Sequence, residues 1–329
     1  MRVGLLQFFG WRDRSVPLND VYERALERIE IMDRSGYDAV WLAEHHFTGY
    51  SVCPSVHVMA AHVAARTKNL RIGTAVTLAS FYHPLRIAEE IALLDVLTGG
   101  RINWGAGRGF DPREFSIFGV PPDESADRFH EAVEIVLAAW SNERLTFEGR
   151  FHRYEDVEVL PKPLQRPHPP TWVAASSPPA IDWAAGRGLS IMMDPHSPHP
   201  EIARKRKRYA DGLAATGHSL AGREIPMGRL VAVADTDEEA LAIASRGAKW
   251  TAGAYLPKEA LGRFRPGEEE IDPVDHYLRD VVIHGSPERV IDQLKQLEEE
   301  IPMGYLLLSP LSEKTFGHFT DKVLPHIAG

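Results

Sequence analysis

The sequence contains a single cysteine, Cys53, among its 329 residues. One cysteine forms no disulfide within the chain and builds no cysteine-based zinc site. Basic residues are in the minority, because 37 Lys and Arg stand against 46 Asp and Glu and give a formal net charge of −9. This charge argues against a protein that binds nucleic acid or anionic membranes through a general basic surface.

Targeting and fold-specific motifs are also missing. The first stretch, MRVGLLQF, has too short an apolar run for a signal peptide or a membrane span, so we expect a cytoplasmic protein. There is no G-x-S-x-G elbow of a serine hydrolase and no P-loop. The segment Gln7–Trp11 has one glycine, whereas the dinucleotide-binding turn after a first strand needs several.

Eight short, continuously apolar runs alternate with longer amphipathic stretches. Continuous apolar runs are typical of parallel strands buried on both faces. Eight strand–helix units predict the α/β class, with a single (β/α)8 TIM-type barrel domain over residues 1–329; a doubly wound sheet is the alternative. The predicted strands are Arg2–Phe8, Ala39–Ala43, Arg71–Leu78, Arg101–Ala106, Thr171–Ala175, Leu189–Met193, Arg229–Ala234 and Tyr305–Ser309.

Two segments are longer than a barrel requires. Asn142–Pro170 is rich in proline and contains the alternating FHRYEDVEV, which predicts a small hairpin. Ala254–Asp280 is rich in glycine, proline and acidic residues, and we expect it to act as a lid over the barrel mouth.

The second predicted strand ends in Glu44-His45-His46-Phe47. Alternation along a strand directs His45 and His46 to opposite faces, so one histidine reaches the mouth of the barrel. A metal site is disfavoured, because neither an H-x-H nor an H-E-x-x-H spacing supplies a second ligand. A purely capping or interface role for both histidines is the other alternative.

Small residues and hydroxyls follow the next two strand ends. Gly105–Gly109 lets a planar ligand approach the backbone, and its Arg108 is suited to a phosphate. Ser176 and Ser177 precede a helix start, where hydroxyls and amides bind anions. Because strands four and five are neighbours in a barrel, Arg108 and the serines are expected to share one phosphate. The alternatives are tight barrel closure at the glycines and a simple N-cap at the serines.

Apolar residues complete the predicted pocket, and a phosphorylated cofactor fits it. We expect its wall to include Phe8, Trp41, Trp104, Phe110 and Met193. Three other features are weaker. Asp194–His196 with His199 forms either a mouth lining or a polar loop, Arg204–Arg208 is most simply a solvated helix face, and Cys53 has no neighbouring base.

Several long motifs in order make the chain recognisable. They are GYDAVWLAEHHF (36–47), RIGTAV (71–76), HPLRIAEEIALLD (83–95), GGRINWGAGRG (99–109), LPKPLQRPHPPTWVAASSP (160–178) and GSPERVIDQL (285–294). Over nearly its whole length the sequence resembles the bacterial luciferase-like family of flavin-dependent monooxygenases. The resemblance implies a (β/α)8 barrel that binds FMN and forms homodimers.

The resemblance also assigns roles to individual residues. His45 matches a flavin-site histidine thought to act as acid or base. A non-proline cis peptide of the family falls at Ala75–Val76, under the flavin ring. Arg108, within Gly107–Phe110, and Ser176 or Ser177 match the residues that hold the FMN phosphate. Gly107 stands where light-emitting members have a cysteine, so bioluminescence is not expected.

The expected function is therefore an FMN-dependent monooxygenase. The resemblance implies that reduced FMN comes from a separate NAD(P)H-dependent flavin reductase, and that oxygen forms a flavin 4a-peroxide that oxidises a small, mostly apolar substrate. One alternative is hydride transfer with deazaflavin, which the E-H-H-F form of the second strand end disfavours. Another is a non-catalytic flavin-binding protein.

Overall fold

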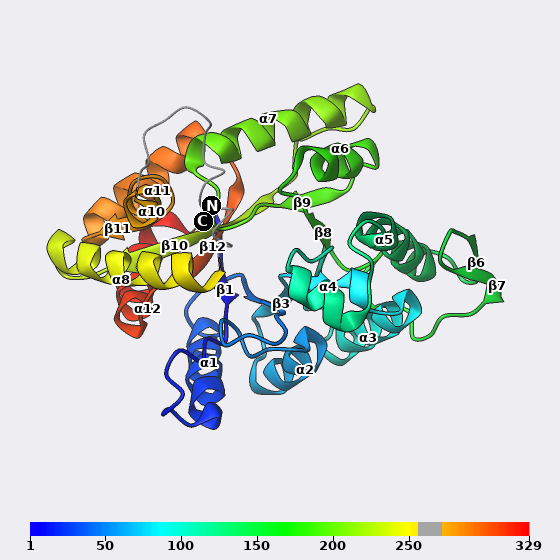
Figure 1. The fold of residues 1–329 in the computed structure, drawn as a ribbon, viewed down its shortest axis with the longest axis horizontal. Coiled ribbons are helices and arrows are strands. Elements are labelled where there is room, and N and C mark those ends of the chain that lie inside the picture. Colours follow the sequence, from blue (N-terminus) through cyan, green and yellow to red (C-terminus); the bar gives the residue numbers. More distant parts are fainter. Residues whose placement is uncertain (256–271, 329) are drawn as a thin grey trace. The chain divides into compact units, whose positions relative to one another are not determined.

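The computed structural model describes residues 1–255 and 272–328. They form two compact units: unit 1 combines residues 1–6 with the chain from residue 175 onward, and unit 2 is residues 7–174. Each unit alternates parallel strands with helices, as the α/β class predicts (Figure 1). The expectation of a single domain stays a prediction.

Unit 2 is built on a parallel sheet in the order β2, β3, β5, β8, with the short β4 paired to β5. Its strands are β2 (Ala39–Leu42), β3 (Arg71–Thr74), β4 (Thr77–Leu78), β5 (Ile102–Gly107) and β8 (Thr171–Ala174). Its helices are α1 (Leu18–Met32), α2 (Val56–Arg66), the 3-10 turn η1 (Ala79–Phe81), α3 (Pro84–Leu97), α4 (Pro112–Phe118) and α5 (Ser125–Ser141). Every residue of β2 and β5 is buried, which explains their continuous apolar sequences.

Helix α4 was not predicted, although its ends follow ordinary capping chemistry. The Asp111 side chain accepts a hydrogen bond from the backbone amide of Arg113, and Pro112 occupies the first turn. Gly119 ends the helix in the left-handed conformation with φ 69°. This short helix follows the end of β5, so it lies beside the candidate site.

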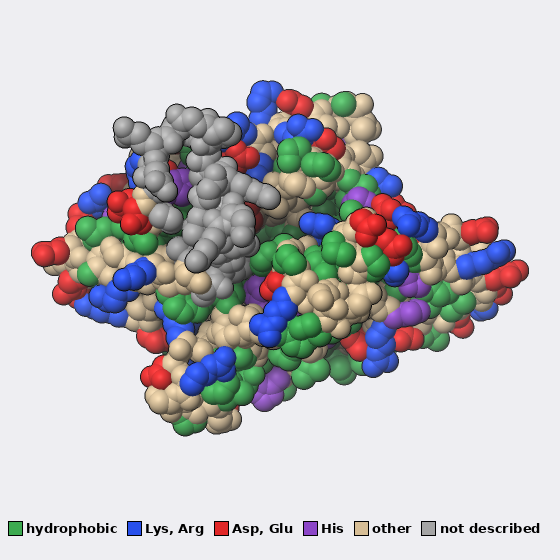
Figure 2. Space-filling view, viewed as in Figure 1, with side chains coloured by type: hydrophobic (Ala, Val, Ile, Leu, Met, Phe, Trp, Pro, Cys, Tyr) green, Lys and Arg blue, Asp and Glu red, His purple; other side chains and the backbone are tan. Residues whose placement is uncertain are grey.

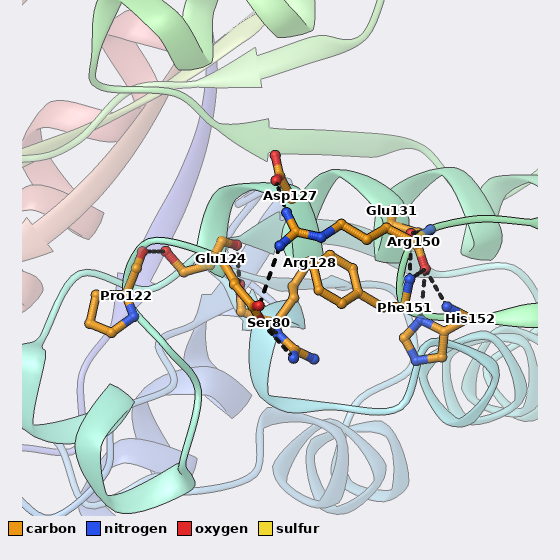
Figure 3. A network of polar contacts seen from close by, with 10 residues as sticks. Ser80, Pro122, Glu124, Asp127, Arg128, Glu131, Arg150, Phe151 and His152 are labelled. Carbon is orange, nitrogen blue, oxygen red and sulfur yellow. Dashed lines mark hydrogen bonds and ion pairs between the residues drawn. The ribbon is translucent and has the colours of Figure 1, made fainter.

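The predicted hairpin is present as the antiparallel pair β6 (Leu145–Glu148) and β7 (Arg153–Val157). Glu131 of α5 holds the turn, because its carboxylate accepts the backbone amides of Arg150, Phe151 and His152 at 2.6, 3.1 and 2.7 Å (Figure 3). Of the second predicted insertion, residues 256–271 lie outside the described residues, so the lid stays a prediction.

Unit 1 holds a parallel sheet in the order β11, β10, β12, β1. Strand β9 leads to Met193, which forms a parallel bridge with Met227 of β10. The strands are β1 (Arg2–Gln7), β9 (Ser190–Met192), β10 (Ile225–Val233), β11 (Ile283–Gly285) and β12 (Gly304–Pro310). The helices are α6 (Pro178–Gly186), α7 (His199–Ala215), α8 (Asp237–Tyr255), α10 (Pro273–Asp280), α11 (Pro287–Glu300), α12 (Glu313–His318), the π-helical turn η2 (Phe319–Val323) and α13 (Leu324–Ile327).

The surface carries both signs of charge. On the face drawn in Figure 2, acidic and basic side chains are interspersed. Among the helices of the described chain, none combines the length and hydrophobicity needed to cross a membrane.

Candidate functional site

His45 lies just beyond β2, in an aromatic surround. Its ring is stacked on Phe8 with the centroids 6.0 Å apart, and it meets Tyr50 edge-on at 5.2 Å and Phe110 at 6.3 Å. Burial, followed by the neighbouring charge of His46, lowers the pKa of His45 to about 4. His45 is therefore neutral at neutral pH and is able to accept a proton.

His46 is held by two carboxylates. Its Nε2 is 3.0 Å from Oε1 of Glu44, and its backbone amide donates to Oε1 of Glu114 at 2.9 Å. Both carboxylates are buried, and burial raises the pKa of Glu114. The His46 ring also meets Phe118 edge-on at 4.8 Å, so the two carboxylates add hydrogen-bond partners to an aromatic surround.

The peptide bond between Ala75 and Val76 is cis, at the position that the family resemblance implies. The chain then enters β4, where Thr77 pairs with Ala106 and Leu78 pairs with Gly107. A Cβ atom on Gly107 would lie 2.3 Å from Cγ2 of Val76, so the valine methyl group occupies that space. We call Ala75–Val76 together with Gly107 the cradle. Its closely packed backbone suits a planar ring.

Arg108 follows the cradle and is exposed. Its Nη1 donates to the hydroxyl of Ser125 at 3.0 Å, and this hydroxyl donates to the carbonyl of Pro122 at 2.6 Å. Ser80 donates in turn to the carbonyl of Ser125, within the network drawn in Figure 3. Ser125 thereby fixes one edge of the guanidinium at the start of α5, and the exposed remainder is suited to a phosphate.

Ser176 and Ser177 belong to unit 1, where both are exposed. Ser177 is the N-cap residue of α6, but its side chain makes no capping hydrogen bond. Pro178 and Pro179 follow and lack backbone N–H groups, so fewer backbone amides are available to donate to a capping hydroxyl. The simple N-cap alternative therefore does not describe Ser177, whose hydroxyl is suited to an external anion.

The residues expected to form the pocket wall lie on different sheet faces and in different units. Trp41 is fully buried and meets Trp172 at 5.3 Å, whereas Trp104 packs edge-on against Trp140 of α5 at 5.1 Å. Because Trp41 is paired through Gly73 to Asn103, the residue before Trp104, the two indoles point to opposite faces of the unit 2 sheet. We therefore leave Trp104 out of the proposed pocket. Met193, which is buried, lies in unit 1.

Sequence reasoning missed several residues near His45. Tyr50 contacts both Phe8 and His45, and its place five residues beyond His45 in one loop was an available signal. Tyr82 and His57 reach the same region from distant segments, and no spacing rule indicates them. Within the described parts of the chain, no group of three or more His, Cys, Asp or Glu side chains is arranged to hold a metal ion.

Comparisons with known sequences give one family. Its profile, that of luciferase-like monooxygenases, matches residues 1–302. The uncharacterized protein y4wF of Sinorhizobium fredii is 43% identical over 170 residues, which are 52% of this chain and 50% of that protein. The chain thus matches about half the length of this relative. The oxygenase component of the flavin-dependent trigonelline monooxygenase of Acinetobacter baylyi is 28% identical over 297 residues, 87% and 81% of the two chains.

Solved structures share the fold over the full length. Monooxygenase RslO1 from Streptomyces bottropensis has a TM-score of 0.84 at 28% identity and complete coverage of both chains. The oxygenating constituent of 3,6-diketocamphane monooxygenase from Pseudomonas putida, solved with FMN, has a TM-score of 0.82 at 20% identity and covers 99% and 98%. An F420-dependent secondary alcohol dehydrogenase has a TM-score of 0.79 at 18% identity and covers 100% and 99%. The predicted TIM-type α/β fold is confirmed.

Proposed function

Because the chain belongs to the luciferase-like monooxygenase family and is a flavin-dependent oxidoreductase, we propose that it is an oxygenase component that uses reduced FMN and molecular oxygen to oxidise a small, mostly apolar organic substrate. The family membership predicted from the sequence motifs is confirmed. The observation that carries the proposal is that unit 2 combines a neutral, aromatic-lined His45 with the close-packed cradle.

The residues of the cradle fit a flavin. Ala75, Val76 and Gly107 present backbone and small side chains to the planar ring. Arg108 and Gly109 of unit 2 are proposed to contact the phosphate end. Ser176 and Ser177 of unit 1 are proposed, considered by themselves, as an anion-binding pair. When bound, reduced flavin supplies the electrons with which oxygen is activated. FMN is favoured over deazaflavin by the flavin-dependent relative and by the neighbour solved with FMN, while the F420-dependent neighbour keeps deazaflavin as the alternative.

The protein's own groups have two tasks. His45 accepts the proton that accompanies oxygen transfer and returns it afterwards, because its ring is neutral and able to act as a base at neutral pH. Phe8, Trp41 and Phe110 of unit 2 are the proposed apolar lining, which excludes water from the reacting centre and favours an apolar substrate. Tyr50 joins this set through its contacts with Phe8 and His45. Met193 is proposed as an apolar substrate-pocket residue of unit 1, considered by itself.

A separate NAD(P)H-dependent flavin reductase is the proposed partner. The name of the trigonelline monooxygenase relative, an oxygenase component, supports a reductase on another chain. Coupled turnover tests this: the protein with NADH and FMN consumes oxygen and substrate only after a flavin reductase is added.

A homodimer through α2 and α3 is also proposed. Val58 of α2 is 71% exposed and Leu97 of α3 is 70% exposed, and Leu93 lies one helical turn before Leu97. Apolar side chains with this exposure on two packed helices suit a protein interface. Light scattering during gel filtration is expected to give the mass of a dimer for the wild type and of a monomer for Leu97→Glu. The same mass for both proteins would contradict this interface.

The first experiment is a titration of the purified protein with FMN and with deazaflavin coenzyme, each oxidised and reduced. We expect preferential binding of reduced FMN and, on adding oxygen, a transient absorbance that precedes reoxidised flavin. Deazaflavin binding with no oxygen-dependent transient would transfer the protein to hydride-transfer enzymes. FMN binding with no reductase-coupled turnover of any substrate would indicate flavin storage.

A further inference from the structure

Glu44 is a buried carboxylate directly before His45. It is 3% exposed, and its side chain has no exposed surface. A buried carboxylate is costly unless donors surround it, and Glu44 has three. Its Oε1 is 3.0 Å from both Nε2 of His46 and the hydroxyl of Tyr82, and its Oε2 is 3.5 Å from the backbone amide of Leu78.

The bond to Leu78 connects Glu44 to the cradle. Leu78 is two residues beyond the Ala75–Val76 peptide and pairs with Gly107 across β4 and β5. The Val76 side chain occupies the space that a Cβ atom on residue 107 would need. A shift of β4 therefore moves both walls of the cradle relative to each other.

A second buried group holds the same strand. His57 of α2 places Nε2 3.0 Å from the hydroxyl of Thr77 and Nδ1 2.7 Å from Glu90 of α3. The ring centroids of Tyr82 and His57 are 5.8 Å apart, and Tyr82 also donates to Glu44. Tyr82 therefore lies between the contacts of Glu44 and those of His57. Burial, and then the Glu44 carboxylate, raise the pKa of Tyr82, which keeps its hydroxyl a donor to Glu44.

We propose that Glu44 is a positioning residue that fixes β4 to the histidine pair and so keeps the flavin cradle in register with His45. The inference rests on the proposed function. Glu44 does not touch the cofactor in this scheme; it acts through the Leu78 amide on one side and through His46 on the other.

The test compares Glu44→Ala with Glu44→Gln. Alanine leaves the Leu78 amide, the Tyr82 hydroxyl and the His46 ring without their shared acceptor. We expect the Kd for FMN, from fluorescence titration, to rise about tenfold or more, as orphaned buried donors imply. We expect kcat at saturating reduced flavin to fall less than the affinity. Glutamine keeps one acceptor and turns its NH2 toward Tyr82 or His46, so we expect its Kd within about threefold of the wild-type value.

Glu114→Gln is the matched control. Glu114 is also buried and also bonds to His46, through the backbone amide, but it has no hydrogen bond to Thr77 or Leu78. Its FMN Kd is expected to stay near that of the wild type. If Glu44→Ala does not fold, judged by circular dichroism, Tyr82→Phe replaces it; the loss of one donor to the carboxylate is then expected to raise Kd about fivefold, above the threefold allowed for Glu44→Gln.

Wild-type binding of FMN separates the two proposals. Absence of FMN binding by the wild type defeats the proposed function. Wild-type binding together with an unchanged Kd in Glu44→Ala, or in its Tyr82→Phe replacement, overturns only the role of Glu44. A Glu44→Gln variant as impaired as Glu44→Ala would also overturn it, because positioning by hydrogen bonds would then not account for the loss.

Discussion

Two strand ends in this protein carry a carboxylate with a histidine close behind it, and they use the pair differently. At the end of β2 in unit 2, Glu44 precedes His45. At the end of β9 in unit 1, Asp194 precedes Pro195 and His196. Both carboxylates accept several hydrogen bonds, but only one of them has an ammonium partner.

The partner of Asp194 is Lys205 of α7, whose Nζ lies 2.9 Å from Oδ2. Asp194 also accepts the amides of His196 and Ser197 at 3.1 and 2.8 Å. Burial alone raises the pKa of Asp194, yet the charge and hydrogen bond of Lys205, then the charge of His196 and the Ser197 hydroxyl, hold it at about 2. The β9 end thus carries an ion pair within a hydrogen-bonded loop.

Glu44 has donors on the backbone, a tyrosine and a histidine, and His45 beside it is uncharged at neutral pH. A carboxylate followed closely by a histidine therefore does not by itself define what either side chain does. Asp194 has a lysine partner and forms an ion pair, which we call the anchor. Glu44 has donors but no lysine or arginine, and the histidine beside it, His45, stays neutral and able to accept a proton.

The largest effect is expected at His45. His45→Asn removes the proton acceptor and is expected to lower kcat about 10²- to 10⁴-fold, while FMN Kd stays within about threefold. Steady-state kinetics and flavin titration measure both. The same change at the other strand end, His196→Asn, is the control and is expected to keep kcat within about threefold. Full activity of His45→Asn would remove its catalytic role.

Breaking the anchor is expected to cost stability rather than catalysis. Asp194→Ala leaves Lys205 nearly buried without its counter-charge, and the free energy of unfolding is expected to fall by about 3 kcal/mol. Urea denaturation measures this. Asp182→Ala, which breaks the half-exposed pair with Arg208, serves for comparison and is expected to cost below about 1 kcal/mol. Equal losses would show that burial of the pair is unimportant.

The pH dependence of stability separates the two ends. Below about pH 6.5 the unfolded chain protonates His45 and the folded chain does not, so stability falls as the pH decreases to about 4. Asp194 has a lowered pKa, so its contribution is complete above about 3.8 and is lost toward pH 2. The His45 window is expected to span about 3 kcal/mol and the Asp194 window about 2 kcal/mol. Unfolding curves of His45→Asn should show a reduced slope in the upper window only, since His199, whose pKa is also lowered to about 4, still contributes there; an unchanged slope would contradict the lowered pKa of His45.

The smallest effect is expected where a carboxylate is bound largely by backbone. Glu131→Gln keeps one acceptor for the amides of residues 150–152 and is expected to cost about 1 kcal/mol, localised to the β6–β7 hairpin. Hydrogen exchange of these amides measures it. Glu148→Gln, on the exposed side of the same hairpin, is the reference and is expected to leave exchange unchanged. Faster exchange throughout unit 2 would argue against a local anchor.

Much of the fold was predictable because buried parallel strands are continuous apolar runs. All eight predicted runs contain strands, and the hairpin followed from alternation in 151–159. Helix α4 was missed because it has only seven residues, although Asp111, Pro112 and Gly119 mark both of its ends. The polar helix α7 was recognised only through Arg204–Arg208, where buried Lys205 differs from its solvated neighbours.

The candidate site was predictable where motifs are local and not where contacts are distant. His45, Arg108 and the Ala75–Val76 peptide follow from contiguous motifs. Tyr82 reaches Glu44 across 38 residues, and His57 reaches Thr77 across 20, so tertiary packing brings them together. Trp104 illustrates the converse, since only the pairing of β3 with β5 shows that it faces α5.

The packing of Val76 on Gly107 has a consequence for how this family member can change. Valine is stiff about χ1 and does not swing aside, so a side chain at position 107 finds room only if position 76 becomes smaller. In evolution or design the two positions behave as one: Gly107→Cys alone is obstructed, while the pair Val76→Ala with Gly107→Cys exchanges volume across the strands. A reactive thiol is thus two coordinated substitutions away from this scaffold.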